Sequence, residues 1–117
     1  MKKGPARRDV WVANLDPTKG REQSGSRPCL VVSTDRFNAG PADLVVVLPI
    51  TSRRKGIPLH VPIAAPEAGL KIDSYVKCED IRSVSKSRLS RRLGVVSDLT
   101  MKQVEARLEL LLELGRT

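Results

Sequence analysis

Apolar residues occur along most of this chain in short runs, a spacing that is typical of β-strands and not of long helices. The stretch 44–48 is continuous and β-branched, which predicts a central strand that is covered on both faces. Pro49 lacks an amide donor and is expected to end the regular ladder of that strand. Strands are predicted over residues 8–15, 28–34, 44–48, 59–63, 75–84 (continuous or bent) and 93–96.

Prolines and polar segments mark the edges and turns between these runs. Pro58 and Pro62 place the strand 59–63 at an edge of the sheet, because neither proline can donate a hydrogen bond to a neighbouring strand. The segments 35–41 and 86–89 are predicted to be loops, each able to contain a short helical turn.

A helical spacing begins near the end of the chain. Ser97 is a good N-cap, Asp98 suits a first turn and Gly115 suits the position just past the end, which predicts a helix over 98–114. Its apolar residues recur at intervals of three and four and form a wide stripe. They are Met101, Val104, Ala106, Leu108, Leu110, Leu111, Leu112 and Leu114. The stripe can cover the sheet, contact a second subunit, or do both, and packing on the sheet is the default.

Many short strands, Gly/Pro turns and one terminal helix predict a mainly β fold, a small β-barrel or strongly coiled sheet with the helix across one side. The 117 residues suffice for one domain and not for two, and residues 1–7 are expected to form a flexible arm. No apolar run approaches the roughly 20 residues that a membrane span needs, and no signal-peptide core follows Met1. We therefore expect a cytoplasmic protein with no membrane partner.

Side chains that bind metals are scarce and scattered. Cys29 and Cys78 lie in apolar, strand-like contexts, which favours two buried, reduced thiols over a disulfide. His60, the only histidine, invites interpretation as a general base, but a solvated or hydrogen-bonded histidine on an edge strand is the commoner case. No His/Cys cluster or tight carboxylate group appears, so we expect neither a metal nor another cofactor.

The net charge of +8 points to a polyanionic partner, most often a nucleic acid. The positive charge lies outside the terminal helix, since four acidic and three basic side chains follow from Asp98 on. Charge alone does not separate RNA from DNA, from an acidic protein, or from a merely soluble basic surface. With only three aromatic residues, base stacking cannot be the main source of affinity, so polar contacts to base edges and phosphates must contribute more.

A long polar loop, residues 16–26, separates the first two predicted strands. Hairpin loops usually have about two to five residues, and longer loops are often functional. Pro28 biases Arg27 towards an extended conformation, so a guanidinium is held where the loop meets the core. Thr51 follows the predicted central strand and offers a hydroxyl at a defined position above the sheet.

Several motifs occur in order along the chain. Residues 9–32 read D-V-W-x-x-x-L-D-P-T-x-G-x-E-Q-x-G-x-R-P-x-L-V-V, residues 48–52 read L-P-I-T-S, and residues 73–84 read D-S-Y-V-K-C-E-D-I-R-S-V. Together with the L-S-R-R-L-G of residues 89–94, they resemble the MazF/PemK family of toxin endoribonucleases. Arg8 stands where that family usually has Gly, and Asp80 where it usually has Gln; the second departure bears on the preferred RNA sequence.

The resemblance implies an SH3-like barrel, a two-fold homodimer, and a separate acidic, partly disordered antitoxin. It also implies cleavage of single-stranded RNA by Arg27 and Thr51, with the 2′-hydroxyl attacking the adjacent phosphate to leave a 2′,3′-cyclic phosphate. Arg27 suits charge stabilisation and protonation of the leaving group, because a guanidinium with a pKa above about 12 is a poor base. Glu22 is the candidate proton acceptor, although a solvated loop charge is its commoner role.

Other residues in these motifs are candidates for RNA binding. Gln23 and Ser24 in the long loop, with Ser52 and Arg53 after the central strand, are expected to contact bases and phosphates. Glu79 and Asp80 match family positions that help to read the edges of splayed, single-stranded bases.

Three functions stay open at this point. The first is a sequence-specific endoribonuclease toxin controlled by an antitoxin. The second is a non-enzymatic toxin on the same barrel, like the related gyrase poisons, and the third is a plain RNA-binding module. Arg27 and Thr51 in their motifs favour the first. We further expect the loop 16–26 to be mobile or displaced in an inhibited state, with the antitoxin covering Arg27, Thr51 or both.

Overall fold

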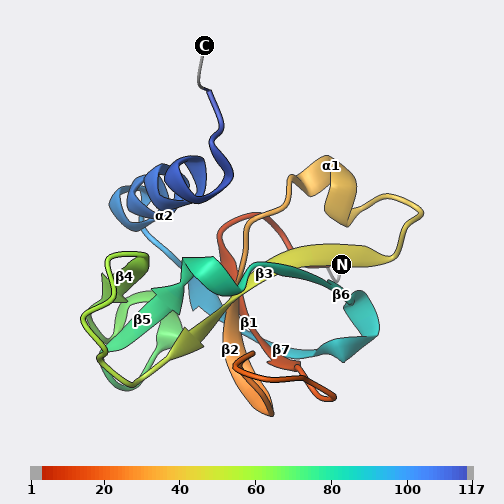
Figure 1. Ribbon diagram of the computed structural model, residues 1–117. Coiled ribbons are helices and arrows are strands. Elements are labelled where there is room, and N and C mark those ends of the chain that lie inside the picture. Colours follow the sequence, from red (N-terminus) through yellow and green to blue (C-terminus); the bar gives the residue numbers. More distant parts are fainter. Residues whose placement is uncertain (1–3, 116–117) are drawn as a thin grey trace.

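Short antiparallel strands and one long terminal helix make up the computed structural model, which describes residues 4–115 (Figure 1). The strands are β1 (Asp9–Asn14), β2 (Ser26–Val31), β3 (Leu44–Thr51), β4 (His60–Ile63), β5 (Ser74–Lys77), β6 (Arg82–Ser85) and β7 (Leu89–Val95). The helices are α1 (Asp35–Asn38) and α2 (Asp98–Leu112), with 3₁₀ turns η1 (Glu67–Gly69), η2 (Cys78–Asp80) and η3 (Lys86–Arg88). The mainly β fold with a C-terminal helix and short helical turns is thus confirmed.

The strands form one curved sheet in the order β4-β5-β3-β2-β1-β7, and β6 pairs with β3 outside this path (Figure 1). β4 pairs only with β5, so it is the edge strand that Pro58 and Pro62 predicted. The run predicted over 75–84 is bent: the turn η2 separates β5 from β6. Because of this bend, β5 and β6 pair with different parts of β3.

The regular pairing of β3 with β2 and β6 ends by Pro49, as expected, but the strand itself, predicted over 44–48, does not end at Pro49. β3 continues through it to Thr51, and Pro49 lies opposite Cys29 of β2. On its other edge, β3 pairs with β6 through Val47 and with β5 from Ile50 onward. Pro49 stands at this change of partner, where neither β5 nor β6 pairs with it, so the missing amide donor does not interrupt a ladder there.

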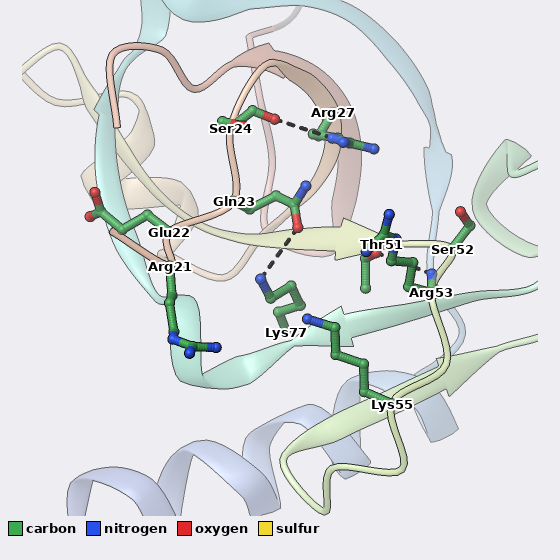
Figure 2. A pocket seen from close by; sticks show the side chains of 10 residues that line it. All are labelled: Arg21, Glu22, Gln23, Ser24, Arg27, Thr51, Ser52, Arg53, Lys55 and Lys77. Atoms are coloured by element: carbon green, nitrogen blue, oxygen red, sulfur yellow. Dashed lines mark hydrogen bonds between the residues drawn. The ribbon is translucent and has the colours of Figure 1, made fainter. Parts of the chain in front are cut away.

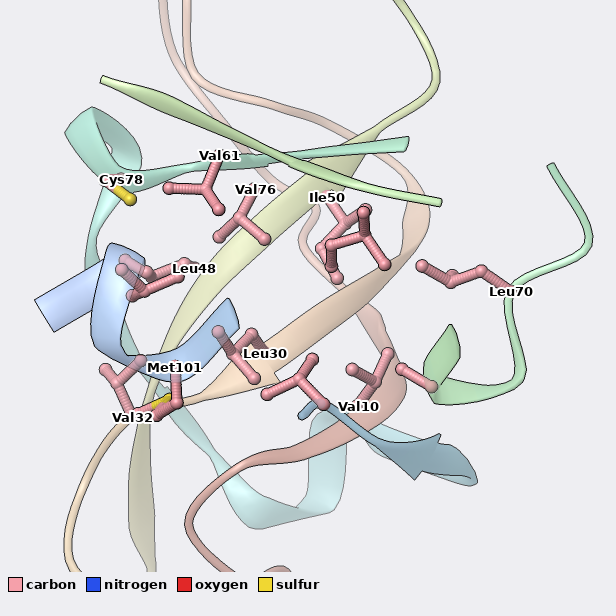
Figure 3. Close-up of a cluster of buried hydrophobic side chains, with 14 residues drawn as sticks. Val10, Leu30, Val32, Leu48, Ile50, Val61, Leu70, Val76, Cys78 and Met101 are labelled. Atoms are coloured by element: carbon pink, nitrogen blue, oxygen red, sulfur yellow. The ribbon is translucent and has the colours of Figure 1, made fainter. Parts of the chain in front are cut away.

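Successive residues of β2 and β3 point to opposite faces of the sheet and enter two separate hydrophobic clusters. Leu30 and Leu48 belong to the first cluster, which the side chain of Met101 from α2 helps to close (Figure 3). Cys29 and Val47 belong to the second. β3 is therefore buried on both faces, as its continuous apolar sequence predicted.

The helix α2 begins where its capping residue predicted. The Ser97 hydroxyl accepts a hydrogen bond from the Thr100 amide at 3.1 Å. The helix ends at Leu112, two residues earlier than predicted, because Glu113 adopts the left-handed conformation before Gly115 does. Met101 and Val104 are buried and Leu108 is partly buried against the same cluster, whereas Leu110, Leu111 and Leu112 are exposed, so the apolar stripe packs on the sheet only as far as Leu108. The exposed members of the helix and its end are Leu99, Leu110, Leu111, Leu112 and Leu114.

β7 begins four residues earlier than predicted and pairs with β1 along an irregular ladder. At Gly94 it packs so closely on η1 that no side chain fits at this position: a Cβ on Gly94 would lie 2.6 Å from the carbonyl carbon of Ala68. At the other end of the chain, residues 1–3 of the predicted arm lie outside the described residues. Arg7 is bound to the body of the protein, since its amide donates to Asp35 and its guanidinium to Glu105.

Candidate functional site

The β1–β2 hairpin places Arg27 at the start of β2, directly after the loop that joins the two strands. We call this loop, residues 15–25, the first loop. Nε of Arg27 donates to the Ser24 carbonyl at 3.2 Å, which leaves the two terminal nitrogens of the guanidinium for a ligand. Figure 2 shows this guanidinium beside the cavity that the first loop borders. A planar fork of donors in this position suits a phosphate.

Thr51 is the last residue of β3 and is almost fully buried. Its hydroxyl oxygen accepts a hydrogen bond from the Arg53 amide at 3.1 Å. This bond uses a lone pair of the oxygen and fixes its position, so the hydroxyl proton is available to donate to a ligand. Arg53 also shapes the start of the loop between β3 and β4.

A cavity of about 330 Å³ lies between these two loops (Figure 2). It is lined by Arg21, Glu22, Gln23, Ser24, Arg27, Thr51, Ser52, Arg53, Lys55 and Lys77. The structure thus brings together seven of the nine residues singled out in the sequence, from segments that are far apart along the chain. The three that sequence reasoning missed, Arg21, Lys55 and Lys77, are all cationic.

Charge dominates this cavity, where five cationic side chains face a single carboxylate. This is the Glu22 carboxylate, which accepts a hydrogen bond from the Lys19 amide at 2.7 Å. In Figure 2 it points away from Arg27 and Thr51, on the outer side of the first loop. A concentration of fixed positive charge at a concave surface attracts polyanions.

The first loop is held to the sheet at Gln23. The Gln23 amide donates to Oδ2 of Asp80 at 2.8 Å, and the Gln23 carbonyl accepts from Arg82 at 3.1 Å. Nζ of Lys77 lies 3.3 Å from the Gln23 side-chain oxygen. Asp80 also bonds Arg82 at 2.7 Å, so its carboxylate is engaged within the protein in this state. We call Lys77, Asp80 and Arg82 the loop anchor.

A second cavity, of about 560 Å³, adjoins the first. The two share Arg21, Glu22, Lys55 and Lys77, and the second adds Ile57, His60, Glu79 and Asp80. His60 is the hydrogen-bonded edge-strand histidine that the sequence favoured: its Nε2 lies 2.9 Å from Oε2 of Glu79. The ring is buried and not solvated. Glu79 and Asp80 therefore lie beside the cationic cavity and not within it.

Both cysteines are free and buried, as predicted. Burial raises the pKa of each thiol from 9.0 to about 12, so neither is a thiolate near neutral pH. Cys29 and Cys78 belong to different hydrophobic clusters.

Two further features concern residues 4–115 as a whole. The described residues bring together no group of three or more His, Cys, Asp or Glu side chains that could hold a metal ion. Neither helix of this part of the chain has the length and apolar character that a membrane crossing requires.

Comparisons with known proteins give a consistent result. Residues 6–112 match the model of a family described as the PemK-like, MazF-like toxin of type II toxin-antitoxin systems. The chain is 38% identical over 113 residues to endoribonuclease MazF9 of Mycobacterium tuberculosis, covering 92% of this chain and 96% of that protein.

Solved structures agree with the family match. The chain resembles MazF from Deinococcus radiodurans with a TM-score of 0.83 and 33% identity, over 97% of this chain and 100% of the other. It resembles a chain of the MazE-MazF complex from the same organism with a TM-score of 0.80 and 30% identity, over the same shares. By sequence, by fold and by the order of its motifs, this chain belongs to the family of PemK-like, MazF-like toxins of type II toxin-antitoxin systems.

Proposed function

We propose that this toxin is a sequence-specific endoribonuclease that cleaves single-stranded RNA without a metal ion. The observation that supports it most is the meeting of Arg27 and Thr51, from two different strands, at one strongly cationic cavity. The relative from Mycobacterium tuberculosis is named an endoribonuclease, and the chain covers nearly all of it. An RNA strand supplies both the negative charge that this cavity attracts and the 2′-hydroxyl that the reaction needs.

In the proposed reaction, the 2′-oxygen attacks the adjacent phosphorus and the bond from phosphorus to the 5′-oxygen breaks. Negative charge develops on the non-bridging phosphoryl oxygens in the transition state. The terminal nitrogens of Arg27 and the hydroxyl of Thr51 are donors that can meet this charge. Arg27 passes a proton to the leaving 5′-oxygen, and the products are a 2′,3′-cyclic phosphate and a free 5′-hydroxyl.

Glu22 is our candidate for the group that accepts the proton of the 2′-hydroxyl. Its carboxylate is bonded to the Lys19 amide in the present structure and points out of the cavity. The role therefore requires a rearrangement of the first loop that frees Glu22 and turns it inward. Glycines at positions 20 and 25, both with positive φ, give this loop the backbone freedom for such a change.

The other candidate residues divide into two groups. Gln23, Ser24, Ser52 and Arg53 line the cationic cavity, where they can contact phosphates and the bases next to the cleaved bond. Glu79 lies in the adjoining cavity and is free to contact a more distant base. Asp80 holds the loop through Oδ2 and its side chain is only 12% exposed, so in our proposal its first role is to hold the loop.

We also propose that an acidic antitoxin covers Arg27, Thr51 or both, and that binding displaces the first loop. A related chain has been solved as a MazE-MazF complex, and the cationic cavity suits an acidic segment of such a partner. We further propose a homodimer, because the exposed leucines of α2 offer an apolar surface for a second subunit. We propose that the protein acts in the cytoplasm.

The test is to incubate the purified protein with a long single-stranded RNA in EDTA and to look for discrete fragments. Arg27→Ala serves as the inactive variant. Arg36→Ala, which removes an equal charge from the exposed surface of α1, serves as the matched control and should cleave like wild type. RNA that is bound but left intact by the wild type would instead identify a binding module, and no binding would exclude both.

A further inference from the structure

His60 has a contact that its position on an edge strand does not require. It is the first residue of β4 and is only 7% exposed. Its Nε2 lies 2.9 Å from Oε2 of Glu79, and its Nδ1 is buried with no hydrogen-bond partner among the described residues. A buried ring nitrogen without a hydrogen-bond partner lowers stability, so its presence in a folded protein calls for an explanation.

The geometry fixes the direction of this hydrogen bond. An ionised carboxylate can only accept, so Nε2 of His60 is the donor and Oε2 of Glu79 the acceptor. Nε2 is the only ring nitrogen with a partner among the described residues. The ring therefore acts as a fixed donor from the core side of the cavity.

The contact holds one end of Glu79 and leaves the other end for a ligand. The Glu79 side chain is 33% exposed and lines the cavity of about 560 Å³. Oε1 has no hydrogen-bond partner in residues 4–115, in contrast to Oε2. Around it, Arg21, Lys55 and Lys77 provide positive charge, and Ile57 provides an apolar surface. An unstacked nucleotide can be bound by cations at its phosphates, by an apolar surface beside its base and by an acceptor at the edge of its base.

We propose that His60 is a positioning residue that holds Glu79 as a fixed acceptor for one base of the RNA. A carboxylate accepts and cannot donate, so it favours a base with an exocyclic amino group: adenine, cytosine or guanine. Uracil has no exocyclic amino group: its single Watson–Crick donor, N3–H, lies between two carbonyl oxygens, so a carboxylate that accepts from N3–H is repelled by a carbonyl oxygen beside it. His60 thus sets a preference against uracil at one position of the cleaved sequence. This inference rests on the proposed endoribonuclease function.

The experiment maps the cleavage ends of the full-length protein on long RNAs of known sequence. It then measures cleavage of two short RNAs that differ only at the mapped position, where one has the preferred base and the other uracil. His60→Met removes the donor while keeping a side chain of similar length. His60→Gln keeps a donor, since its amide nitrogen can take the place of Nε2. Glu79→Gln replaces the pure acceptor by a group that both accepts and donates.

The wild type is expected to prefer an amino-bearing base over uracil by about fivefold or more, the lower limit for one good polar contact to a base. In His60→Met this ratio should fall below about twofold through slower cleavage of the preferred RNA, with cleavage of the uracil RNA unchanged. His60→Gln should restore most of the ratio, and Glu79→Gln should lose it. A purely structural defect would slow both RNAs equally.

Each failure has a distinct meaning. If the wild type cleaved no RNA, the proposed function itself would be wrong. If it cleaved RNA but tolerated uracil at every position, or if His60→Met kept the full ratio, the role of His60 would be refuted. If circular dichroism showed that His60→Met does not fold, Glu79→Gln would decide: a retained preference against uracil in that variant would overturn the inference.

Discussion

Replacing Asp80 with asparagine should destabilise the protein and release the first loop. The Asp80 carboxylate lies 2.7 Å from Arg82 and 3.8 Å from Nζ of Lys77. The side chains of Asp80, Lys77 and Arg82 are only 12%, 10% and 16% exposed. Asparagine keeps the size, but it offers the Gln23 amide only a weaker, uncharged acceptor and leaves two largely buried cations without their counter-charge.

The expected magnitude follows from this burial. Breaking a buried ion pair by removing one partner typically costs about 3 to 5 kcal/mol, because the remaining charge stays buried. The residual exposure and the retained carbonyl oxygen place Asp80→Asn at the lower end, about 3 kcal/mol. Glu105→Gln is the matched control: it removes a carboxylate that pairs with Arg7 but is 47% exposed, and it should cost about 0.5 kcal/mol or less.

Urea unfolding, followed by the fluorescence of Trp11, would measure the change in the free energy of unfolding for both variants. Native-state hydrogen exchange at the Gln23 amide would report the release of the loop, since that amide donates to Asp80. In Asp80→Asn the Gln23 amide should exchange faster than in the wild type. The amides of β3 should change only by as much as the free energy of global unfolding does. A loss below about 1 kcal/mol in Asp80→Asn with unchanged exchange at Gln23 would refute the idea that a buried carboxylate anchors the loop.

Three further results are expected. Arg27→Ala and Thr51→Ala should each slow cleavage by about 10²- to 10³-fold in single-turnover assays with unchanged circular dichroism, because each removes a fixed donor to the transition state; wild-type rates in either variant would misplace the site. Cleavage should persist in EDTA and stop when the cleaved nucleotide carries 2′-deoxyribose, and fragments from that substrate would contradict an internal nucleophile. Burial raises the pKa of Cys29 and Cys78 from 9.0 to about 12, so the free energy of unfolding should fall as pH rises from 9 towards 12, where only the unfolded thiols ionise; an equal fall in the double variant Cys29→Ala, Cys78→Ala would show that other groups cause it.

The fold was predictable where local sequence and tertiary environment agree. The apolar run of β3 reflects burial on both faces, and Ser97 both signals and caps the start of α2. The prediction ended β3 too early, at residue 48, because a single sequence does not reveal that the strand continues past Pro49 with a new partner. It shortened β7 because residues 90–92 are polar and exposed, and their pairing with β1 leaves no apolar pattern.

The site was predictable to a similar degree. Arg27 and Thr51 stand in recognisable motifs, and the structure brings both to one cavity. Lys77 was missed because a lysine in a strand reads as a solvated charge, and only the closure of the first loop over β5 buries it. Arg82 was also missed, because its bond to the Gln23 carbonyl joins residues 59 positions apart. Long-range contacts of this kind have no local signal.

The position of Thr51 at the end of β3 has a consequence for the time scales of the site. Thr51 is buried and pairs with Tyr75 of β5, at the end of a strand that is covered on both faces, so we expect it to become exposed only in rare, large openings of the sheet. The first loop rests on the few polar contacts of the loop anchor and can open locally, far more often. Thr51 is thus expected to move on the slow time scale of large openings, and the first loop on the faster time scale of local openings. In the proposed function, an RNA or an antitoxin would therefore meet a fixed Thr51 and a first loop that opens locally, and substitutions in the first loop could change recognition without disturbing β3.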